Sequence, residues 1–333
     1  MSSLPVFDYV NATSPAEAMG QLGAGWSEAA LYAGGVDLLD LMKERLYEPK
    51  KLVNIKTAPS LKYIKVENGE VRIGPLVTLA EIAAHPELQK SHPALARAAG
   101  KAATPQIRNL ATIGGNLCQR PRCWYFRSED FPCMRKGGEK CFAKEGENRY
   151  HAIFTEGEPC VIVHPSAAGV ALVAFGAQLK IASSSGERTV DIEKFFVRPK
   201  DNVRRENVLG PKDLITEIVI PASAAGMASA YIKIREKQSY DWPLADVAVV
   251  AKLSGANVEA CRIVLGSAAP VPHRATEAEE FLKGKPLNEE NAARAGELAV
   301  KDASPLEQNA YKVPLFKTVV RRTLLALKET KAS

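Results

Sequence analysis

Cysteine is the residue type whose spacing most clearly suggests chemistry in this 333-residue sequence. Five of the six cysteines fall between positions 118 and 160, and Cys261 stands apart. The five are separated in turn by 4, 9, 7 and 18 residues, so the Cys-x-x-Cys pairs of zinc ribbons are absent. Thiolates on a segment rich in arginine and lysine favour an iron–sulfur cluster, whose negative charge the basic side chains would offset. A zinc site and free thiols stay open as alternatives.

Two glycine pairs are the next candidates. Gly34-Gly35 separates an apolar, strand-like run at 29–33 from a helical run at 38–43. At such a position the start of a helix presents backbone N–H groups to a diphosphate. The second pair is part of Thr112-Ile113-Gly114-Gly115-Asn116. Each pair alone also fits an ordinary turn or bulge, but two such loops suit a dinucleotide held between two subdomains.

Nothing in the sequence suggests acid–base or nucleophilic catalysis. The five histidines share no metal-ligand spacing, and no Ser-His-Asp or paired-carboxylate arrangement can be argued from residue order. Gly23-Ala24-Gly25 begins like a dinucleotide fingerprint, but Glu28 stands where the third glycine belongs and the strand follows the motif. We therefore expect no Rossmann NAD site and no catalytic side chain, a pattern that suits an electron carrier.

The elements that position these residues belong to an ordinary globular protein. With 46% hydrophobic and 25% charged residues the chain is not disordered, and its length predicts two or three domains. The net charge of +6 comes from scattered residues, which argues against nucleic-acid binding. No apolar run is long enough for a membrane span, and residues 1–9 lack the layout of a signal peptide. We expect a cytoplasmic protein, or a periplasmic one if an exported partner subunit carries it.

Local patterns outline the order of these elements. Capping boxes at Ser14 and Thr78 begin helices, and another helix is expected from 93 to 103. The stretch from 118 to 160 has neither helical nor strand periodicity and looks like an insertion. Strands are expected at 52–55, 71–74, 169–179, 189–196, 214–221, 230–235, 247–253 and 263–266, and further helices at 277–282, 289–300 and 317–327.

Over essentially its whole length the chain resembles the FAD-binding medium subunits of the molybdenum hydroxylases, the family of xanthine dehydrogenase, carbon monoxide dehydrogenase and the aldehyde oxidoreductases. The resemblance is carried by Ala33-Gly34-Gly35-Val36-Asp37-Leu38, Ala111-Thr112-Ile113-Gly114-Gly115-Asn116, and Gly266-Ser267-Ala268-Ala269-Pro270 with Pro272 and Arg274. It implies an α+β fold: a two-subdomain FAD-binding unit of the vanillyl-alcohol-oxidase and xanthine-dehydrogenase type, then a C-terminal α/β domain with a small antiparallel sheet. The implied domains are residues 1–57, 58–222 with the insertion at about 118–160, and 223–333.

The resemblance also implies which residues hold the flavin. These are Ala33, Gly34, Gly35, Val36, Asp37, Leu38, Thr112, Gly115, Asn116, Ser166, Ile215, Lys233 and Trp242. One position departs from the family pattern, because Ala167 follows Ser166 where an aspartate that helps to hold the flavin is usual. Apart from the family, a tryptophan such as Trp242 is more often a core or interface residue.

The insertion is similar to that of the subgroup that adds a 4Fe-4S cluster to this subunit, namely the three-subunit bacterial aldehyde oxidoreductases and, more distantly, the 4-hydroxybenzoyl-CoA reductases. On that pattern the cluster ligands are Cys123, Cys133, Cys141 and Cys160. Cys118 stands where these relatives commonly have an aliphatic residue, so we expect it to be a bystander.

The function implied by the resemblance is that of an FAD and 4Fe-4S electron-transfer subunit of a molybdenum-dependent aldehyde oxidoreductase. Its partners would be a large molybdenum-cofactor subunit, a small 2Fe-2S subunit and an external electron acceptor. The nearest alternative is the corresponding subunit of a 4-hydroxybenzoyl-CoA reductase, where electrons flow inward to molybdenum. An alternative of another class is a zinc-binding interaction module without flavin.

Overall fold

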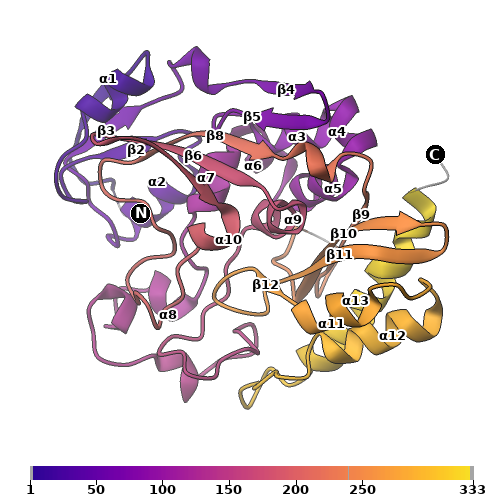
Figure 1. Ribbon diagram of the computed structural model, residues 1–333. Helices are drawn as coiled ribbons and strands as arrows, with labels where there is room; N and C mark the ends of the chain where they lie inside the picture. The colour runs from indigo at the N-terminus through magenta and orange to yellow at the C-terminus, as the bar shows by residue number, and fades with distance from the viewer. Residues whose placement is uncertain (1–2, 239, 331–333) are drawn as a thin grey trace.

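Three sheets organise the chain, whose residues 3–238 and 240–330 are described by a computed structural model (Figure 1). The first sheet is parallel, with the order β1-β3-β2 (Asp8–Asn11, Lys51–Asn54 and Ala30–Tyr32). Helix α2 (Val36–Lys43) connects β2 to β3, as the run around Gly34-Gly35 predicts. Helix α1 (Pro15–Gly20) begins at Ser14, which accepts a hydrogen bond from Glu17 N, but the Glu17 carboxylate bonds Thr13, so the predicted capping box is only half formed.

The second sheet is antiparallel and has five strands. Their order is β4-β5-β8-β6-β7 (Ile64–Glu67, Glu70–Ile73, Leu214–Ile220, Gln178–Ser183 and Gly186–Asp191). Five helices lie between β5 and the insertion: α3 (Leu79–Ala84), α4 (Pro86–Ser91), α5 (Pro93–Lys101), α6 (Pro105–Leu110) and α7 (Ile113–Cys118). The capping box predicted at Thr78 is present, with both of its hydrogen bonds to Glu81.

Two predicted strands are wrong in part. Most of 169–179 forms helix α9 (Ala167–Phe175), in which every residue is buried. A helix that is apolar on all sides has no period to distinguish it from a buried strand, which explains the error. The segment 189–196 begins as β7 but turns at Asp191 into the short helix α10 (Ile192–Phe195).

The third sheet is antiparallel, with the order β12-β11-β10-β9 (His273–Arg274, Asn257–Gly266, Ala245–Ser254 and Ala228–Ile234). Successive residues of β10 belong to different cores: Val247 and Val249 pack in one core, and Ala248 and Val250 in the other. Helices α13 (Lys312–Thr330) and α11 (Thr276–Leu282) pack on one face of this sheet, and α12 (Glu289–Leu298) packs against both of them. Helices α5 and α9 pack on the other face. The sheet is therefore covered on both faces and joins the C-terminal part to the rest.

The insertion lies below this body in Figure 1 and contains only short helical pieces: α8 (Trp124–Arg127) and the 3-10 turns Met134–Lys136 and Phe142–Lys144. Its end is fixed to the C-terminal part by polar contacts. Asn309 Nδ2 and the buried Lys312 Nζ both donate to the carbonyl of His151, at 3.1 and 3.0 Å. No helix among the described residues is long and apolar enough to cross a membrane.

Candidate flavin and cysteine sites

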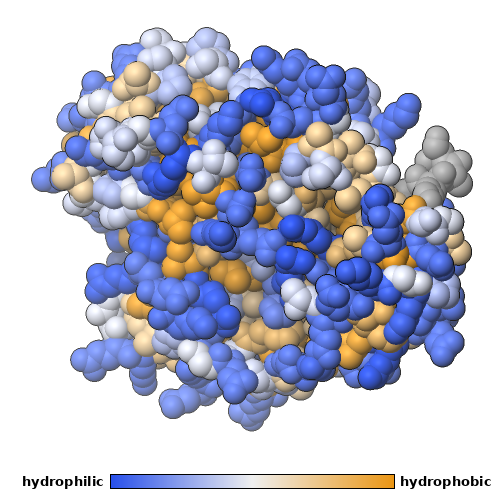
Figure 2. Space-filling view, viewed as in Figure 1, coloured by the Kyte–Doolittle hydropathy of each residue, from blue (hydrophilic) through white to orange (hydrophobic). Residues whose placement is uncertain are grey.

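A cavity of about 1030 Å³ lies where the β2–α2 loop, the start of α7 and the third sheet meet. This volume is at the upper end of the range of ordinary ligand pockets. On the face shown in Figure 2, hydrophobic side chains are exposed in a hollow between the lobe that contains α2 and the segment that contains α8. The cavity is large enough and open enough to receive an extended cofactor.

Glycine is required at the β2–α2 loop for two different reasons. A Cβ at Gly34 would overlap the carbonyl oxygen of Leu110 at the end of α6, so only glycine allows this close approach. Gly35 caps α2 in the left-handed conformation, with φ of 72°, which side chains rarely adopt. The start of α2 consequently presents its backbone N–H groups at the cavity wall.

The second glycine pair forms the start of α7 and not a bulge or hairpin. Thr112 caps this helix by accepting a hydrogen bond from Gly115 N at 3.2 Å. Gly114 is buried against Pro75, whereas Gly115 is exposed in the cavity wall. Two loops that are distant in the sequence therefore line one cavity, and each of them is the start of a helix.

Of the thirteen predicted flavin contacts, all but Ser166 line this cavity. Ser166 is buried behind the wall and caps α9, where its Oγ accepts a hydrogen bond from Gly169 N at 2.9 Å. The same hydroxyl donates to Asn116 Oδ1 at 2.7 Å. Ser166 therefore holds Asn116 in position, and its neighbour Ala167 lines the cavity in the place of the usual aspartate.

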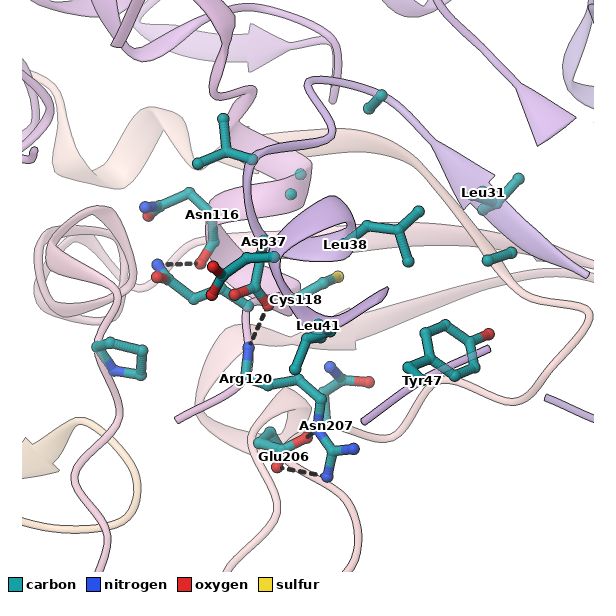
Figure 3. A pocket seen from close by; sticks show the side chains of 18 of the residues that line it. Leu31, Asp37, Leu38, Leu41, Tyr47, Asn116, Cys118, Arg120, Glu206 and Asn207 are labelled. Carbon is teal, nitrogen blue, oxygen red and sulfur yellow. Dashed lines mark hydrogen bonds and ion pairs between the residues drawn. The ribbon is translucent and has the colours of Figure 1, made fainter. Parts of the chain in front are cut away.

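The cavity has a polar side and an apolar side. Figure 3 shows Leu31, Leu38 and Tyr47 on one side, and Asp37, Asn116 and Arg120 on the other. Burial raises the pKa of Tyr47 to about 12, so its hydroxyl stays protonated at neutral pH. An apolar wall suits an aromatic ring system, and a polar wall with helix starts suits a diphosphate.

Arginines from the insertion hold the polar side in place. Asp37 Oδ1 pairs with Arg122 Nη1 and with Arg127 Nη2, each at 2.7 Å, and its Oδ2 accepts a hydrogen bond from Arg120 N at 2.8 Å. The Arg120 side chain turns the other way and binds Glu206 at 3.0 and 3.1 Å. The first turn of α2 is thus tied to the start of the cysteine-rich segment.

The four predicted cluster ligands lie near one another beside this network. Burial, together with the neighbouring thiols of Cys141 and Cys133, raises the pKa of Cys123 to about 11. A hydrogen bond between the thiols of Cys141 and Cys160 lowers the pKa of Cys141 to about 6 and raises that of Cys160. Cys123 and Cys133 also pack in one small apolar cluster with Phe126.

Cys118, the remaining cysteine of the segment, lines the cavity described above. Burial there raises the pKa of its thiol to about 12. Within the described ranges, no three or more His, Cys, Asp or Glu side chains are close enough together to hold a single metal ion. In a 4Fe-4S cube each cysteine binds a different iron, so the thiols need not meet at one point.

Two side chains contact the sulfurs of the cysteine group. Arg135 Nη1 approaches Cys160 Sγ at 4.0 Å, and His151 Nε2 lies 3.2 Å from Cys123 Sγ. Arg135 is buried and is held by Glu206. The positive charge of Arg135 favours a thiolate at Cys160, but the pKa values of Cys123 and Cys160 both lie above the usual value of a thiol.

Comparison with known proteins identifies the family to which the chain belongs. Residues 5–223 match the family described as the FAD binding domain in molybdopterin dehydrogenase, and residues 229–327 match the CO dehydrogenase flavoprotein C-terminal domain. The chain is an FAD-binding subunit of the molybdenum hydroxylase family. Both halves of this flavoprotein subunit, and not only the glycine loops, therefore follow the family pattern.

Individual relatives cover this FAD-binding subunit almost completely. It is 32% identical to the aldehyde oxidoreductase FAD-binding subunit PaoB of Escherichia coli (strain K12), over 96% of this chain and 98% of the relative. It is 30% identical to the carbon monoxide dehydrogenase medium chain of Hydrogenophaga pseudoflava, over 97% of each chain. A solved structure of that carbon monoxide dehydrogenase, which lacks the Mo-pyranopterin moiety of its cofactor, superimposes with a TM-score of 0.76 over 98% of this chain and 99% of that chain. The expected α+β fold of a flavoprotein subunit is confirmed.

The polar residues that connect the two sites were not predicted from the sequence. Arg120, Arg122 and Glu206 line this cavity. Arg122 belongs to the run Arg122-Cys123-Trp124-Tyr125-Phe126 of the insertion, whereas Arg120 and Glu206 are part of no recognisable motif. The arginines looked only like countercharges for a cluster, and Glu206 lies 86 positions beyond Arg120. The one available signal was the density of arginine beside the cysteines.

Proposed function

We propose that this flavoprotein subunit carries FAD and a 4Fe-4S cluster and transfers electrons for a molybdenum-dependent aldehyde oxidoreductase. The observation that carries the proposal is the adjacency of the two sites. Glu206 in the cavity wall binds Arg135, whose Nη1 lies 4.0 Å from Cys160 Sγ. Arg122 also lines the cavity and directly precedes Cys123. FAD, when bound, supplies a group that accepts electrons singly and releases them as a pair.

The chain's own residues serve to bind and orient the flavin. The starts of α2 and α7 offer backbone N–H groups to the diphosphate, and Asn116, held by Ser166, offers an amide to the same wall. Lys233 and Trp242 reach the cavity from the C-terminal part. The thirteen residues predicted to bind flavin stay assigned to the site, with Ser166 acting through Asn116.

The cysteine group supports a cluster in the insertion. We assign Cys123, Cys133, Cys141 and Cys160 as its ligands, with Arg135 as a donor to Cys160 Sγ and His151 Nε2 in contact with Cys123 Sγ. Buried thiols near one another, with cationic and N–H donors directed at them, are what a cluster of thiolate-bound iron requires. The similarity to PaoB, named as an aldehyde oxidoreductase subunit, supports this branch of the family.

We further propose that the subunit works with two partners, a large subunit that holds the molybdenum cofactor and a small subunit that holds 2Fe-2S clusters. Electrons would pass from molybdenum through the 2Fe-2S clusters to FAD and then to an external acceptor. The domain boundaries at 57/58 and 222/223 and the compartment, cytoplasmic or periplasmic, are part of this proposal.

The test is metal and flavin analysis of the complex purified with its native partners. Replacement of Cys133 or Cys141 by serine should remove the iron assigned to this chain, whereas Cys118→Ser should keep about four iron atoms per chain. Cys118 is the matched control because it lies in the same segment but in the flavin cavity. Loss of the iron in Cys118→Ser with retention in Cys160→Ser would overturn the ligand set, and zinc in place of iron would favour the interaction-module alternative.

Two further measurements address the direction of electron flow and the site of chemistry. A cluster potential well below that of the flavin would favour the 4-hydroxybenzoyl-CoA reductase type of enzyme, with inward flow. The flavin-loaded chain alone should not oxidise aldehydes, since it offers no substrate chemistry of its own. Turnover by the isolated chain would contradict the proposed division of labour.

A further inference from the structure

Arg122 occupies a position between the two sites. It immediately precedes Cys123, yet its side chain lines the flavin cavity. Its guanidinium contacts an element on each side: Nη1 pairs with Asp37 Oδ1 at 2.7 Å, and the planar group lies 5.0 Å from the centre of the Trp242 ring. Arg122 thus connects the insertion with the glycine-loop helix and with the C-terminal part.

One donor of this guanidinium has no acceptor. Arg122 Nε is buried, and among the described side chains it is the only arginine nitrogen found buried without a hydrogen-bond partner. The other two nitrogens each have a partner, because Nη1 binds Asp37 and Nη2 donates to Gln119 Oε1 at 3.2 Å. A buried donor without an acceptor is costly, by about 1–3 kcal/mol, unless a ligand satisfies it.

The charges around the site give the ligand a sign. Arg127 shares the Asp37 carboxylate with Arg122, so two guanidinium groups meet there, with Asp40 as the second carboxylate. The side chain of Asp40 is half exposed, whereas those of both arginines are mostly buried. These two arginines and two aspartates balance one another, but the cavity lining as a whole contains eight basic and five acidic residues. A negatively charged ligand would offset this excess of positive charge.

We propose that Arg122 is an FAD-binding residue that the cysteine-rich insertion contributes to the flavin site, where it donates a hydrogen bond to an oxygen of FAD. The inference rests on FAD binding by this chain, but it assigns a contact that lies outside both glycine loops. The acceptor is an oxygen of the diphosphate or of the flavin ring, and both are within the chemistry of a guanidinium donor.

The experiment uses the purified complex after reversible removal of FAD, with FAD affinity measured by the quenching of flavin fluorescence. Arg122→Gln should raise the Kd for FAD on the order of 10-fold or more, as expected for the loss of a hydrogen bond from a charged group. Arg122→Lys keeps the charge but loses the fork of donors, so it should fall between wild type and Arg122→Gln.

Two arginines of the same segment serve as controls. Arg149 is 58% exposed in its side chain, pairs with Glu236 and does not line the cavity, so Arg149→Gln should leave the Kd unchanged within about 2-fold. Arg127 shares Asp37 but also does not line the cavity, so Arg127→Gln reports any effect transmitted through that carboxylate. Iron content, measured for every variant, separates loss of the cluster from loss of the contact.

The outcomes decide the proposal. Wild-type FAD affinity in Arg122→Gln, or an equal loss in Arg127→Gln, overturns it. Should Arg122→Gln fail to fold, Arg122→Lys carries the test, and wild-type affinity in that variant overturns the proposal. If Arg122→Gln binds ADP more weakly than wild type does, the contact is with the diphosphate. If it binds ADP as wild type does but riboflavin more weakly, the contact is with the ring. If the wild-type apoprotein takes up no FAD, the proposed function itself fails.

Discussion

Glu206 supplies the negative charge between the flavin cavity and the cysteine group, so Glu206→Gln perturbs the packing around both. The residue is 6% exposed and accepts hydrogen bonds from Arg120 at 3.0 and 3.1 Å and from Arg135, which is itself 3% exposed. Glutamine keeps the shape of the side chain but leaves two arginines without their countercharge. Removal of one partner from a buried ion pair typically destabilises a protein by about 3–5 kcal/mol.

We expect a loss of this size in the free energy of unfolding, measured by urea denaturation at pH 7 with circular dichroism and flavin fluorescence as probes. The matched control is Glu193→Gln. Glu193 also pairs with two arginines, Arg262 at 2.7 Å and Arg274 at 3.2 Å, but its side chain is 38% exposed. Exposed pairs contribute about 0–1 kcal/mol, so the control should lose much less. Equal losses in the two variants would refute the reasoning.

The effect of pH provides an independent check. Burial raises the pKa of Glu206, but Arg120 and Arg135 outweigh burial and hold the pKa below its usual value. A carboxyl group with a lowered pKa stabilises the fold at pH values above its unfolded pKa of about 4.3, and that stability is lost as the pH falls through the folded pKa. The difference between wild type and Glu206→Gln should therefore be complete at pH 7 and should shrink in acid. A difference that is constant down to low pH would show that the charge is not responsible.

Two further predictions concern the flavin site. Gly35→Val and Gly115→Val should abolish FAD retention in a largely folded chain, because Gly35 has a left-handed φ of 72° and Gly115 is exposed in the cavity wall. Gly20→Ala is the control, since there is open space around the Cβ position of Gly20. Full flavin occupancy in both valine variants would exclude the assignment. Burial lowers the pKa of Lys233 to about 8, so positive charge in the cavity falls as the pH rises from 7 to 9. FAD should bind more weakly over that range in wild type but not in Lys233→Gln, and parallel pH profiles of Kd in the two proteins would count against a contact with Lys233.

The sequence alone determined the features that depend on neighbours along the chain. The helix start at Thr78, the glycine turn before α2 and the strand β8 follow from caps, turns and alternation within a few residues. The two glycine loops and the cysteine group were found in the same way, because each is a short run with a distinctive composition. The family resemblance added the residues contributed by later segments, such as Lys233 and Trp242, and twelve of the thirteen predicted flavin contacts line one cavity.

Only the tertiary structure decided which polar groups meet across long separations. Glu206 pairs with arginines 71 and 86 positions away, and no local pattern encodes a choice among the 44 basic residues. Helix α9 was mistaken for a strand because burial on all sides removed its period, although Ser166 and Gly176 cap its two ends. The tertiary structure also decided the place of Arg122. Its sequence position places it beside a cysteine. The packing of the insertion against α2 directs its side chain into the flavin cavity, because a mostly buried guanidinium is stable only beside a carboxylate, here that of Asp37.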